Sequence, residues 1–575
     1  MGNRMSNEIE GGRLQSMSRR GFIGAAGTAL AVGALAGTVR ARADEAASGL
    51  PSAWDYEAEV VICGFGGAGA MAAKEAVACG MSHIVFEKAP EQYAGGTTTC
   101  CAGVCNATTN VEALVASSMG YMTEEAAQNL ADTEVEVLDW LTASGTVFNG
   151  VMADGFGYGL YHSEANASLA CGANVLYETA AKQLVYDPVT KEVLGVRAVN
   201  AAGEDVYAKA TRGVVLATGN FVANEELVHN FMLPREVEYV QLGSPYDEGD
   251  ALLMGLEIGA ATHNLNSFTL ELTDMALKKA SEEIGVGFDV GATGSYSDSF
   301  IYVNQKGQRF MNEGQSLDHF KGTRPWLEYG GIAAGGYTGW TNLPCYVIFD
   351  SKLADSSPIS TTSSYRMSWA GAQGLHYWSS DNQDEVDRGW LVKADTVEEL
   401  VAALAEQSGR DAIDAAALAE TIEQYNGLCG TIGEEGDAFG RTGFSTIDTP
   451  PYYAAEVVTG AVYTMGGLKP GMRCETLALN GEPIPRLYHA GDVGQFMAIT
   501  SQGTCGAMAA GMIAVRELVS LDPRFIKGDA MTVMPVPTDE QVRMAKEGTG
   551  DVVGEAATDE ADVAVGLEIA NLGEK

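Results

Sequence analysis

The chain has 575 residues, of which 46% are hydrophobic and 19% charged, proportions typical of a folded protein with two or three packed units. Seventy glycines against 16 prolines favour an α/β chain with many tight turns over a proline-rich disordered one. Acidic residues outnumber basic ones by 76 to 35, and this net charge of −41 argues against nucleic-acid binding and favours either solubility or attraction of a cationic protein partner.

The first 43 residues have the features of an export signal. Ser18-Arg19-Arg20-Gly21-Phe22-Ile23 places paired arginines before a mildly apolar stretch, and Ala41-Arg42-Ala43 offers a cleavage site between small residues. This pattern predicts the twin-arginine route, which carries folded proteins, so we expect cofactor insertion before export and a mature protein in the periplasm or cell envelope. A membrane anchor is the alternative, but the stretch is short for a spanning helix.

The region that follows the signal alternates buried strands with helices. We expect buried parallel strands at 59–63, 83–86 and 213–217. We expect helices at 67–80 and 123–144, the second capped by Thr123, and a hairpin at 193–199 and 205–209. This order is typical of an α/β domain built on a parallel sheet.

From about residue 266 the pattern changes. We expect a hairpin over 300–312 with its turn at 305–307, helices near 396–406 and 415–429, and strand-like signals again over 461–519. A middle insertion between two halves of one α/β domain accounts for this order. The last residues are acidic and poor in aromatic side chains, which predicts a flexible tail, with a short partner-binding helix as the alternative.

Residues 64–69 match the spacing G-x-G-x-x-G in a suitable context. A predicted strand precedes Gly64, a predicted helix follows, and Glu87 lies 18 residues past Gly69. Gly64 permits the tight turn, Gly66 lets the backbone approach a pyrophosphate at the helix N-terminus, and Gly69 allows close helix–strand packing. Glu87 can accept hydrogen bonds from ribose hydroxyls. A purely structural Gly-rich turn is the alternative.

Later segments favour FAD over NAD, although both share this fingerprint. The segment 95–99 offers amides and hydroxyls for phosphate, Ala217-Thr218-Gly219 ends a strand of the kind that passes beneath a dinucleotide, and Asp492 can bind ribityl hydroxyls. The Gly-rich helix start at 503–511 can stabilise negative charge on a reduced flavin ring. The expected cofactor contacts are Gly64, Gly66, Gly67, Ala68, Gly69, Glu87, Lys88, Gly95, Gly96, Thr97, Thr98, Gly103, Val185, Ala217, Thr218, Gly219, Gly491, Asp492, Ala507 and Met508.

These segments resemble the fumarate reductase/succinate dehydrogenase flavoprotein family, which includes urocanate reductases and ketosteroid dehydrogenases. The resemblance rests on residues 61–69, 87–90, 217–221, 249–250, 303–313, 464–467 and 487–492. It implies an α/β fold with a discontinuous, Rossmann-like FAD-binding domain and an inserted α+β capping domain that holds substrate against the flavin. The implied division is an export signal at 1–43, FAD-binding parts at 44–265 and 463–525, a capping domain at 266–462 and a tail at 526–575.

The resemblance also implies a reaction and a mode of cofactor attachment. Members of this family pass hydride from reduced flavin to a polarised C=C bond, while a side chain protonates the neighbouring carbon. No His lies between Gly95 and Gly103, where membrane-bound members attach flavin covalently, so noncovalent FAD is expected.

Several catalytic positions depart from the fumarate reductase pattern. The position of the family's Arg acid is Leu317, that of a substrate His corresponds most nearly to Glu271, and the His before T-x-G-G is Tyr463. The Arg of the last Gly-rich segment is absent from 500–503. A dicarboxylate would lack its cationic partners and be repelled by Glu271, so we do not expect fumarate as the substrate.

Three side chains are candidates for the chemistry. Tyr463 can hydrogen-bond a carbonyl or protonate a carbanion-like carbon, or be a packed aromatic at the cap hinge. Glu271 can be an acid or substrate ligand, or an ordinary paired carboxylate, and His319 can be an acid or an exposed loop residue. Arg309, in the shared R-F-x-N-E segment, is interpreted as structural.

The cysteine pattern predicts neither a metal site nor a haem. Cys100, Cys101 and Cys105 lack the spacing of common zinc or iron–sulfur motifs, and they are either buried small residues or a redox-active pair. The sequence contains no C-x-x-C-H, so electrons are expected from a cytochrome-like or membrane quinol-linked donor.

The prediction is therefore an exported FAD-dependent oxidoreductase that reduces an activated C=C bond of a small substrate, with no membrane span after signal removal. Two alternatives stay open: a dehydrogenase that desaturates a ketone or steroid-like substrate, and a flavin-binding electron carrier whose catalytic residues have decayed.

Overall fold

The computed structural model describes most of the chain between residues 50 and 520. The described residues are 50–233, 235, 237–266, 268–269, 275–284, 288, 290, 300–313, 332–333, 336–337, 340–360, 376, 378–433, 435–496 and 503–520. The export signal, the acidic tail, Glu271, Leu317 and His319 lie outside them. Among the described helices, none combines the length and the apolar composition needed to cross a membrane.

The larger sheet is mostly parallel and has the strand order β21-β22-β8-β1-β2-β5. Its strands are β1 (Tyr56–Cys63), β2 (His83–Phe86), β5 (Val175–Leu176), β8 (Asp205–Leu216), β21 (Glu475–Leu477) and β22 (Pro483–His489). β1 runs parallel to β2 and β8, and β22 runs parallel to β8. The carboxyl ends of β1, β2, β8 and β22 therefore meet at one edge, where Gly64, Glu87, Ala217 and Ala490 follow them.

Strand β8 corrects one expectation. The hairpin arm at 205–209 and the buried strand at 213–217 form one strand, Asp205–Leu216, which pairs with β7 (Val193–Val199) at its start and with β22 at its end. The polar residue Arg212 does not interrupt it. Its buried guanidinium donates to the carbonyl oxygens of Leu518 and Val519, both at 3.1 Å, so its polar atoms find partners without breaking the strand.

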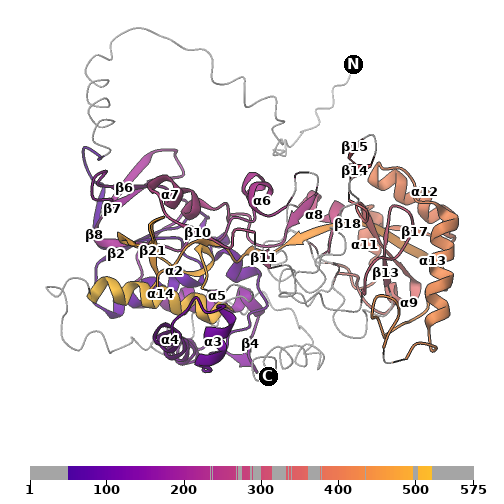
Figure 1. The fold of residues 1–575 in the computed structure, drawn as a ribbon, viewed down its shortest axis with the longest axis horizontal. Coiled ribbons are helices and arrows are strands. Elements are labelled where there is room, and N and C mark those ends of the chain that lie inside the picture. The colour runs from indigo at the N-terminus through magenta and orange to yellow at the C-terminus, as the bar shows by residue number, and fades with distance from the viewer. Residues whose placement is uncertain are drawn as a thin grey trace, which may run out of the picture. The chain divides into compact units, whose positions relative to one another are not determined.

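Helices α2 (Gly67–Ala78) and α14 (Gly503–Ser520) pack on this sheet, with α5 (Phe156–Cys171) against α2 and α4 (Glu124–Ala143) against α14. Thr123 caps α4 as expected, because its Oγ1 accepts from the backbone N–H of Ala126 at 3.2 Å. α14 packs along α2 (Figure 1), and a Cβ at Gly511 would lie 2.2 Å from the carbonyl oxygen of Ala68. The expectation of strands up to 519 is wrong after His489, since α14 occupies the last part of that range.

The second sheet has the order β12-β18-β16-β13, with β17 and β9 also paired to β18. Its strands are β9 (Tyr239–Gln241), β12 (Met275–Leu277), β13 (Phe300–Asn304), β16 (Cys345–Asp350), β17 (Val392–Ala394) and β18 (Tyr452–Ala461). Helices α12 (Val397–Ser408) and α13 (Ala415–Leu428) lie on one side of it (Figure 1), α12 against β17 and β18. The predicted 300–312 hairpin keeps only its first arm as a strand, joined to the return by one bridge between Val303 and Arg309.

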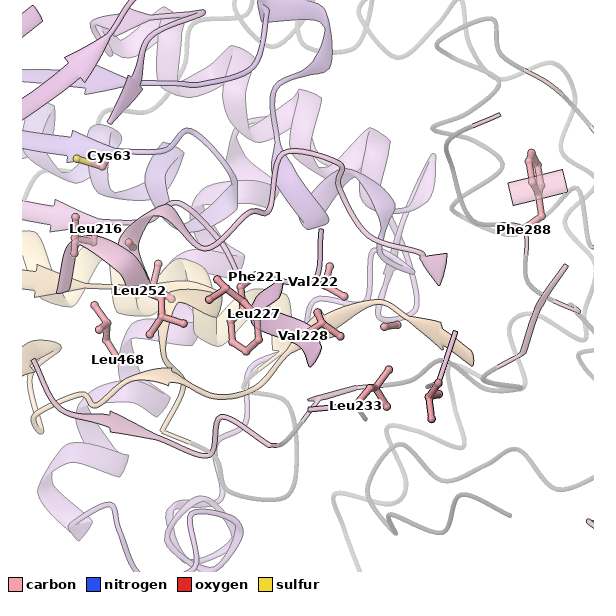
Figure 2. Packing of buried hydrophobic residues seen from close by; sticks show 14 of the residues in the cluster. Cys63, Leu216, Phe221, Val222, Leu227, Val228, Leu233, Leu252, Phe288 and Leu468 are labelled. Atoms are coloured by element: carbon pink, nitrogen blue, oxygen red, sulfur yellow. The ribbon is translucent and has the colours of Figure 1, made fainter. Parts of the chain in front are cut away.

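Two short antiparallel pairs join the regions around the sheets. β10 (Thr262–His263) pairs with β20 (Gly467–Leu468), and β11 (Phe268–Thr269) pairs with β19 (Tyr463–Thr464). One hydrophobic cluster includes residues of both sheets, and in Figure 2 Leu252 of α7 (Asp250–Ile258) lies with Leu216 and Leu468. The chain thus leaves and re-enters the first sheet region along two adjacent ribbons.

The first sheet also includes β6 (Ala180–Tyr186), which pairs with β7. The remaining elements are short. They are η1 (Glu91–Tyr93), η2 (Gly96–Cys100), α3 (Val111–Ser117), β3 (Phe148–Asn149), β4 (Met152–Ala153), α6 (Glu225–Phe231), α8 (Lys278–Ile284), β14 (Ile332–Ala333), β15 (Gly336–Tyr337), α9 (Ser351–Ala354), α11 (Gln383–Asp387) and η5 (Gly491–Val493).

Candidate active site

The turn from β1 into α2 has no room for side chains. Gly64 has φ +101°, and a Cβ on it would lie 2.2 Å from the carbonyl oxygen of Ala217. A Cβ at Gly69 would lie 2.1 Å from the carbonyl oxygen of Gly64. Positive φ and these close approaches both require glycine, so the motif forms the tight strand–turn–helix that its spacing predicts.

Glu87 ties the end of β2 to this turn. Its Oε2 accepts from the backbone N–H of Phe65 and its Oε1 from that of Ala89, both at 2.7 Å. Burial raises the pKa of the Glu87 carboxyl, while the two backbone donors favour the charged form. Each carboxylate oxygen keeps a second lone pair, which suits a ribose hydroxyl.

The glycine-rich segment after β2 lies against the first turn. Gly95 and Gly96 have φ of +120° and +55°. The backbone N–H of Gly67 donates to Thr98 Oγ1 at 3.2 Å, and a Cβ at Gly66 would lie 3.3 Å from the carbonyl oxygen of Gly95. The two turns therefore face each other backbone to backbone, beside the N-terminus of a twelve-residue helix.

The start of α14 and the end of β22 complete this surface with small groups. Gly491 has φ +67°, and a Cβ on it would lie 3.0 Å from Ala68 Cβ and 3.9 Å from Ala507 Cβ. Met508 Cε would be 3.2 Å from a Cβ at Gly67. The start of α2, α14 and Gly491 thus approach one another through backbone and small apolar groups, where the sequence predicts contacts to FAD.

Asp492 directly follows Gly491 after β22. Its Oδ1 accepts from Gln495 Nε2 at 2.5 Å, and burial raises the pKa of its carboxyl to about 6, against the hydrogen bonds from Gln495 and Asn220. A half-buried carboxyl group in this place can accept hydrogen bonds from the ribityl hydroxyls of FAD, as its position in the sequence predicts.

Three other expected contacts have defined partners within the protein. Lys88 pairs with Glu248 and Asp250, at 2.8 and 2.6 Å, and Thr218 Oγ1 accepts from the backbone N–H of Ala251 at 3.1 Å. Gly103, at φ +70°, packs on the start of α5, where a Cβ would lie 2.4 Å from the carbonyl carbon of Phe156. Lys88 and Thr218 thereby fix α7 at the strand edge.

Val185 is not brought to the strand edge. It pairs with Gly195 inside the β6–β7 ribbon, whereas the backbone N–H of Thr179 donates to the carbonyl oxygen of Glu87 at 2.8 Å. Val185 lies six residues farther along an extended strand, a span of roughly 20 Å. The segment beside Glu87 is therefore the start of β6, which the sequence reasoning missed because it has no Gly-rich or charged marker.

Tyr463 follows Val462, a residue that Gly243 separates from the 95–98 turn. It stands in β19, half-buried, and packs on a small cluster that includes Leu242 and Val462. A Cβ at Gly243 would lie 2.2 Å from the carbonyl oxygen of Val462 and 2.8 Å from Thr97 Oγ1. Gly243 therefore connects the strand that carries Tyr463 with the 95–98 turn.

Arg309 and the cysteines have surroundings that account for them. Arg309 donates to Glu313 and Asp437 at 2.8 and 2.9 Å, and these carboxylates raise the pKa of its guanidinium, in keeping with a structural role. Cys101 Sγ donates to the carbonyl oxygen of Thr98 at 3.1 Å, and Cys100 and Cys105 are buried. No group of three described His, Cys, Asp or Glu side chains is arranged to hold a metal ion.

One buried carboxyl group escaped the sequence reasoning. Asp247, 2% exposed, accepts from Thr97 Oγ1 at 2.5 Å and from Asn220 Nδ2 at 2.9 Å, both on its Oδ2. Burial is the main cause that raises its pKa to about 7. Neither a motif nor a periodic pattern distinguishes this Asp from its acidic neighbours, and only the fold brings it to Thr97.

Comparison with known proteins identifies related chains along most of the sequence. The family described as "FAD binding domain" matches residues 140–506. A digoxin reductase of Eggerthella lenta is 25% identical over 561 aligned residues, which cover 83% of this chain and 91% of that protein. A fumarate reductase (cytochrome) of Shewanella frigidimarina is 27% identical, with 83% and 77% coverage.

Solved structures share the fold. The open conformation of a flavocytochrome c3 fumarate reductase aligns with a TM-score of 0.61 at 21% identity, covering 86% of this chain and 80% of that one. A 3-ketosteroid delta1-dehydrogenase from Sterolibacterium denitrificans aligns at 0.59 and 18% identity, with 81% and 100% coverage. The predicted α/β fold and the resemblance are confirmed, and the chain belongs to the FAD binding domain family as an FAD-dependent oxidoreductase that acts on CH–CH or C=C groups.

Proposed function

We propose that this chain is an exported reductase of an activated C=C bond in a small organic substrate other than fumarate, with FAD bound noncovalently. When bound, FAD supplies the hydride. The observation that carries the proposal is the position of Tyr463, half-buried on the strand that Gly243 joins to the 95–98 turn. This supports the proposal, because a C=C reductase needs a proton donor near its cofactor and Tyr463 is the candidate donor on this strand.

The protein's part in the reaction is to bind, orient and protonate. A phenol can donate a hydrogen bond to the substrate's electron-withdrawing carbonyl, or pass its proton to the carbon next to the one reduced. Gly466 and Gly467 fix the backbone after Tyr463, because a Cβ at Gly467 would lie 1.9 Å from the carbonyl oxygen of Val493. The ring is thus attached to a segment packed directly against the FAD-binding half.

The substrate is expected to carry less negative charge than fumarate. In the sequence, Leu317 and Glu271 stand at positions where fumarate reductases of this family hold cationic partners. Relatives of similar overall match include a urocanate reductase of Eggerthella lenta, 24% identical over 86% of this chain, besides the digoxin and fumarate reductases. The names of these relatives record substrates of very different size and charge. This favours substrate selection by the individual residues that each protein holds around its substrate.

Electrons are proposed to come from a separate protein. The chain has no C-x-x-C-H haem motif, and its net charge of −41 would attract a basic cytochrome-like or quinol-linked donor. The paired arginines at 19–20 support export by the twin-arginine route to the cell envelope, where such donors act.

Anaerobic reoxidation of the photoreduced holoenzyme tests the proposal. We expect enones, enoates or aryl acrylates to restore the oxidised flavin spectrum with one saturated product per flavin, and fumarate to do so far more slowly. Failure of every unsaturated compound would overturn the reductase assignment. Bleaching of oxidised enzyme by a saturated ketone, without added reductant, would assign the opposite direction.

Two tyrosine variants distinguish a catalytic role of the protein from a role as an electron carrier. Tyr463→Phe should lower the rate of reoxidation by substrate about 100-fold, within the range of general acid catalysis. Tyr453→Phe is the matched control, because Tyr453 is buried in β18 and stacks on Phe349 at 5.2 Å between ring centroids. Equal rates in the two variants would favour an electron carrier.

A further inference from the structure

Asp247 joins two segments of the cofactor site. Its buried carboxylate accepts hydrogen bonds from Thr97 in the 95–98 turn and from Asn220 after β8, at 2.5 and 2.9 Å. A Cβ at Gly219 would lie 2.6 Å from Asp247 Oδ1, so this oxygen faces the backbone of the turn that follows β8. One side chain therefore holds two of the predicted FAD-binding segments together.

A second acid lies within reach of the same network. The Asn220 amide also hydrogen-bonds Asp492, and the charge of Asp492 opposes ionisation of Asp247. Lys88 favours the ionised form, but it is already paired with Glu248 and Asp250, and Glu87 disfavours it. Burial, together with Asp492 and Glu87, raises the pKa of Asp247 to about 7, against the hydrogen bond from Thr97 and the charge of Lys88. The group can thus change charge near neutral pH.

Thr97 connects this network to the substrate side. The backbone N–H of Ser244 donates to Thr97 Oγ1 at 3.4 Å, and the backbone N–H of Leu242 donates to the carbonyl oxygen of Ala461 at 2.7 Å. The strand that leads to Tyr463 is therefore fastened beside Thr97. Asp247 lies where the cofactor turns meet the strand that carries the candidate acid.

We propose that Asp247 is a positioning residue of the flavin site, whose carboxyl group holds Thr97 and Asn220 in place and whose negative charge, when ionised, lowers the reduction potential of bound FAD. A fixed negative charge in a low-dielectric site opposes the addition of electrons nearby. This role rests on the FAD assignment and not on the identity of the substrate.

The test compares the midpoint potential of bound flavin in the wild type and Asp247→Asn holoenzymes. Asn keeps an oxygen acceptor for Thr97 but has no charge. At about pH 8 we expect the variant to bind reduced FAD, relative to oxidised FAD, about tenfold better than the wild type does, which corresponds to about 30 mV for a two-electron couple. At about pH 5 the two potentials should coincide, because both side chains are then neutral.

An offset of equal size at both pH values, or no offset at either, would overturn the proposal. Glu248→Gln is the charge-matched control, because it also removes one negative charge, from a nearby carboxylate that is half-exposed and pairs with Lys88. We expect it to shift the potential by less than a third as much as Asp247→Asn does. The Asp492→Asn holoenzyme should keep the pH dependence of the flavin potential that Asp247→Asn abolishes.

Thr97→Val gives an independent test should Asp247→Asn fail to hold FAD. Thr97→Val removes a hydrogen-bond donor that stabilises the charged Asp247 carboxylate, so it should raise the pKa of that group. The pH above which the flavin potential falls more steeply should therefore be higher in this variant than in the wild type. An unchanged bend would contradict the role of Asp247. These potentials require no substrate, so a failed substrate assignment would leave them interpretable.

Discussion

The carboxylate of Glu87 and the backbone N–H of Phe65 lie 2.7 Å apart, which fastens the end of β2 to the turn after β1. The same carboxylate accepts from Ala89 with its other oxygen. Two strand ends are thereby held in one geometry before any ligand binds, and the remaining lone pairs point to a hydroxyl-bearing ligand such as the ribose of FAD.

Glu87→Gln should weaken FAD binding. The amide is uncharged and turns an N–H toward one of the two backbone donors, so the ribose hydroxyl loses a hydrogen bond to a charged acceptor, worth about 1.5–3 kcal/mol. This predicts a Kd for FAD raised roughly 10- to 100-fold, measured by titrating apoprotein with FAD and following flavin fluorescence. The exposed Glu91→Gln is the control, and equal Kd values in both variants would contradict the assigned role.

Gly69→Ala should destabilise the fold around the first turn. The added Cβ would meet the Gly64 carbonyl oxygen at 2.1 Å, a backbone atom that cannot move away freely, and we expect a loss of about 3 kcal/mol or more in the free energy of unfolding. Gly427→Ala, in the helix α13 with open space around its Cβ, should instead add about 0.5–1 kcal/mol. Urea denaturation measures both changes in the free energy of unfolding. A gain in both variants, or a loss in both, would contradict this packing.

The Arg441–Glu313 pair predicts a large effect in the second sheet region. Arg441 is 1% exposed and donates to Glu313 at 2.8 Å and to the carbonyl oxygen of Phe300 at 3.0 Å. Arg441→Met leaves the buried Glu313 carboxylate with Arg309 as a charged partner but removes a hydrogen bond to a charged group, and should cost about 1.5–3 kcal/mol of unfolding free energy. Breaking the exposed Arg235–Glu226 pair by Arg235→Met should cost less than about 1 kcal/mol. Comparable losses would show that the buried network is not as described.

Glu134 predicts a pH-dependent stability difference. It is 2% exposed, its Oε2 accepts from the backbone N–H of Thr108 at 2.6 Å, and burial raises its pKa to about 7. Because the folded-state pKa lies above the unfolded one, the stability this group contributes is complete below about pH 4 and is lost as pH rises through 7. Glu134→Gln should therefore gain roughly 2–3 kcal/mol relative to the wild type between about pH 4 and pH 8.

Denaturation at both pH values checks this prediction. The exposed Glu124→Gln, ten residues earlier on the same helix, is the control and should show no such gain. A pH-independent difference for Glu134→Gln would mean that the carboxyl group titrates at its ordinary value in the folded protein.

The local geometry of the cofactor turn was predictable because glycine spacing and the preceding strand are local signals. Gly64 and Gly69 lie where steric contact forbids any side chain, which is what their spacing implies. The strand β8 was not predictable as one element, because the partners of the charged residue Arg212 in its middle, Glu59 and the carbonyls of α14, are distant in sequence. Asp247 was missed for the same reason, since its partner Thr97 lies 150 residues away.

The substrate half of the site was less accessible to sequence reasoning. Its elements are short, from two-residue strands such as β19 and β20, which give almost no periodic pattern. Tyr463 was found through the adjacent T-x-G-G turn, whereas Glu271 and His319 remain predictions, since both lie outside the described residues.

The cofactor itself allows the most direct test of the central claim. Purified protein should absorb at about 450 nm, as oxidised flavin does. Acid precipitation should release one FAD per chain into the supernatant and leave none on the pellet. Colourless protein that gains no flavin absorbance after incubation with FAD would contradict the account.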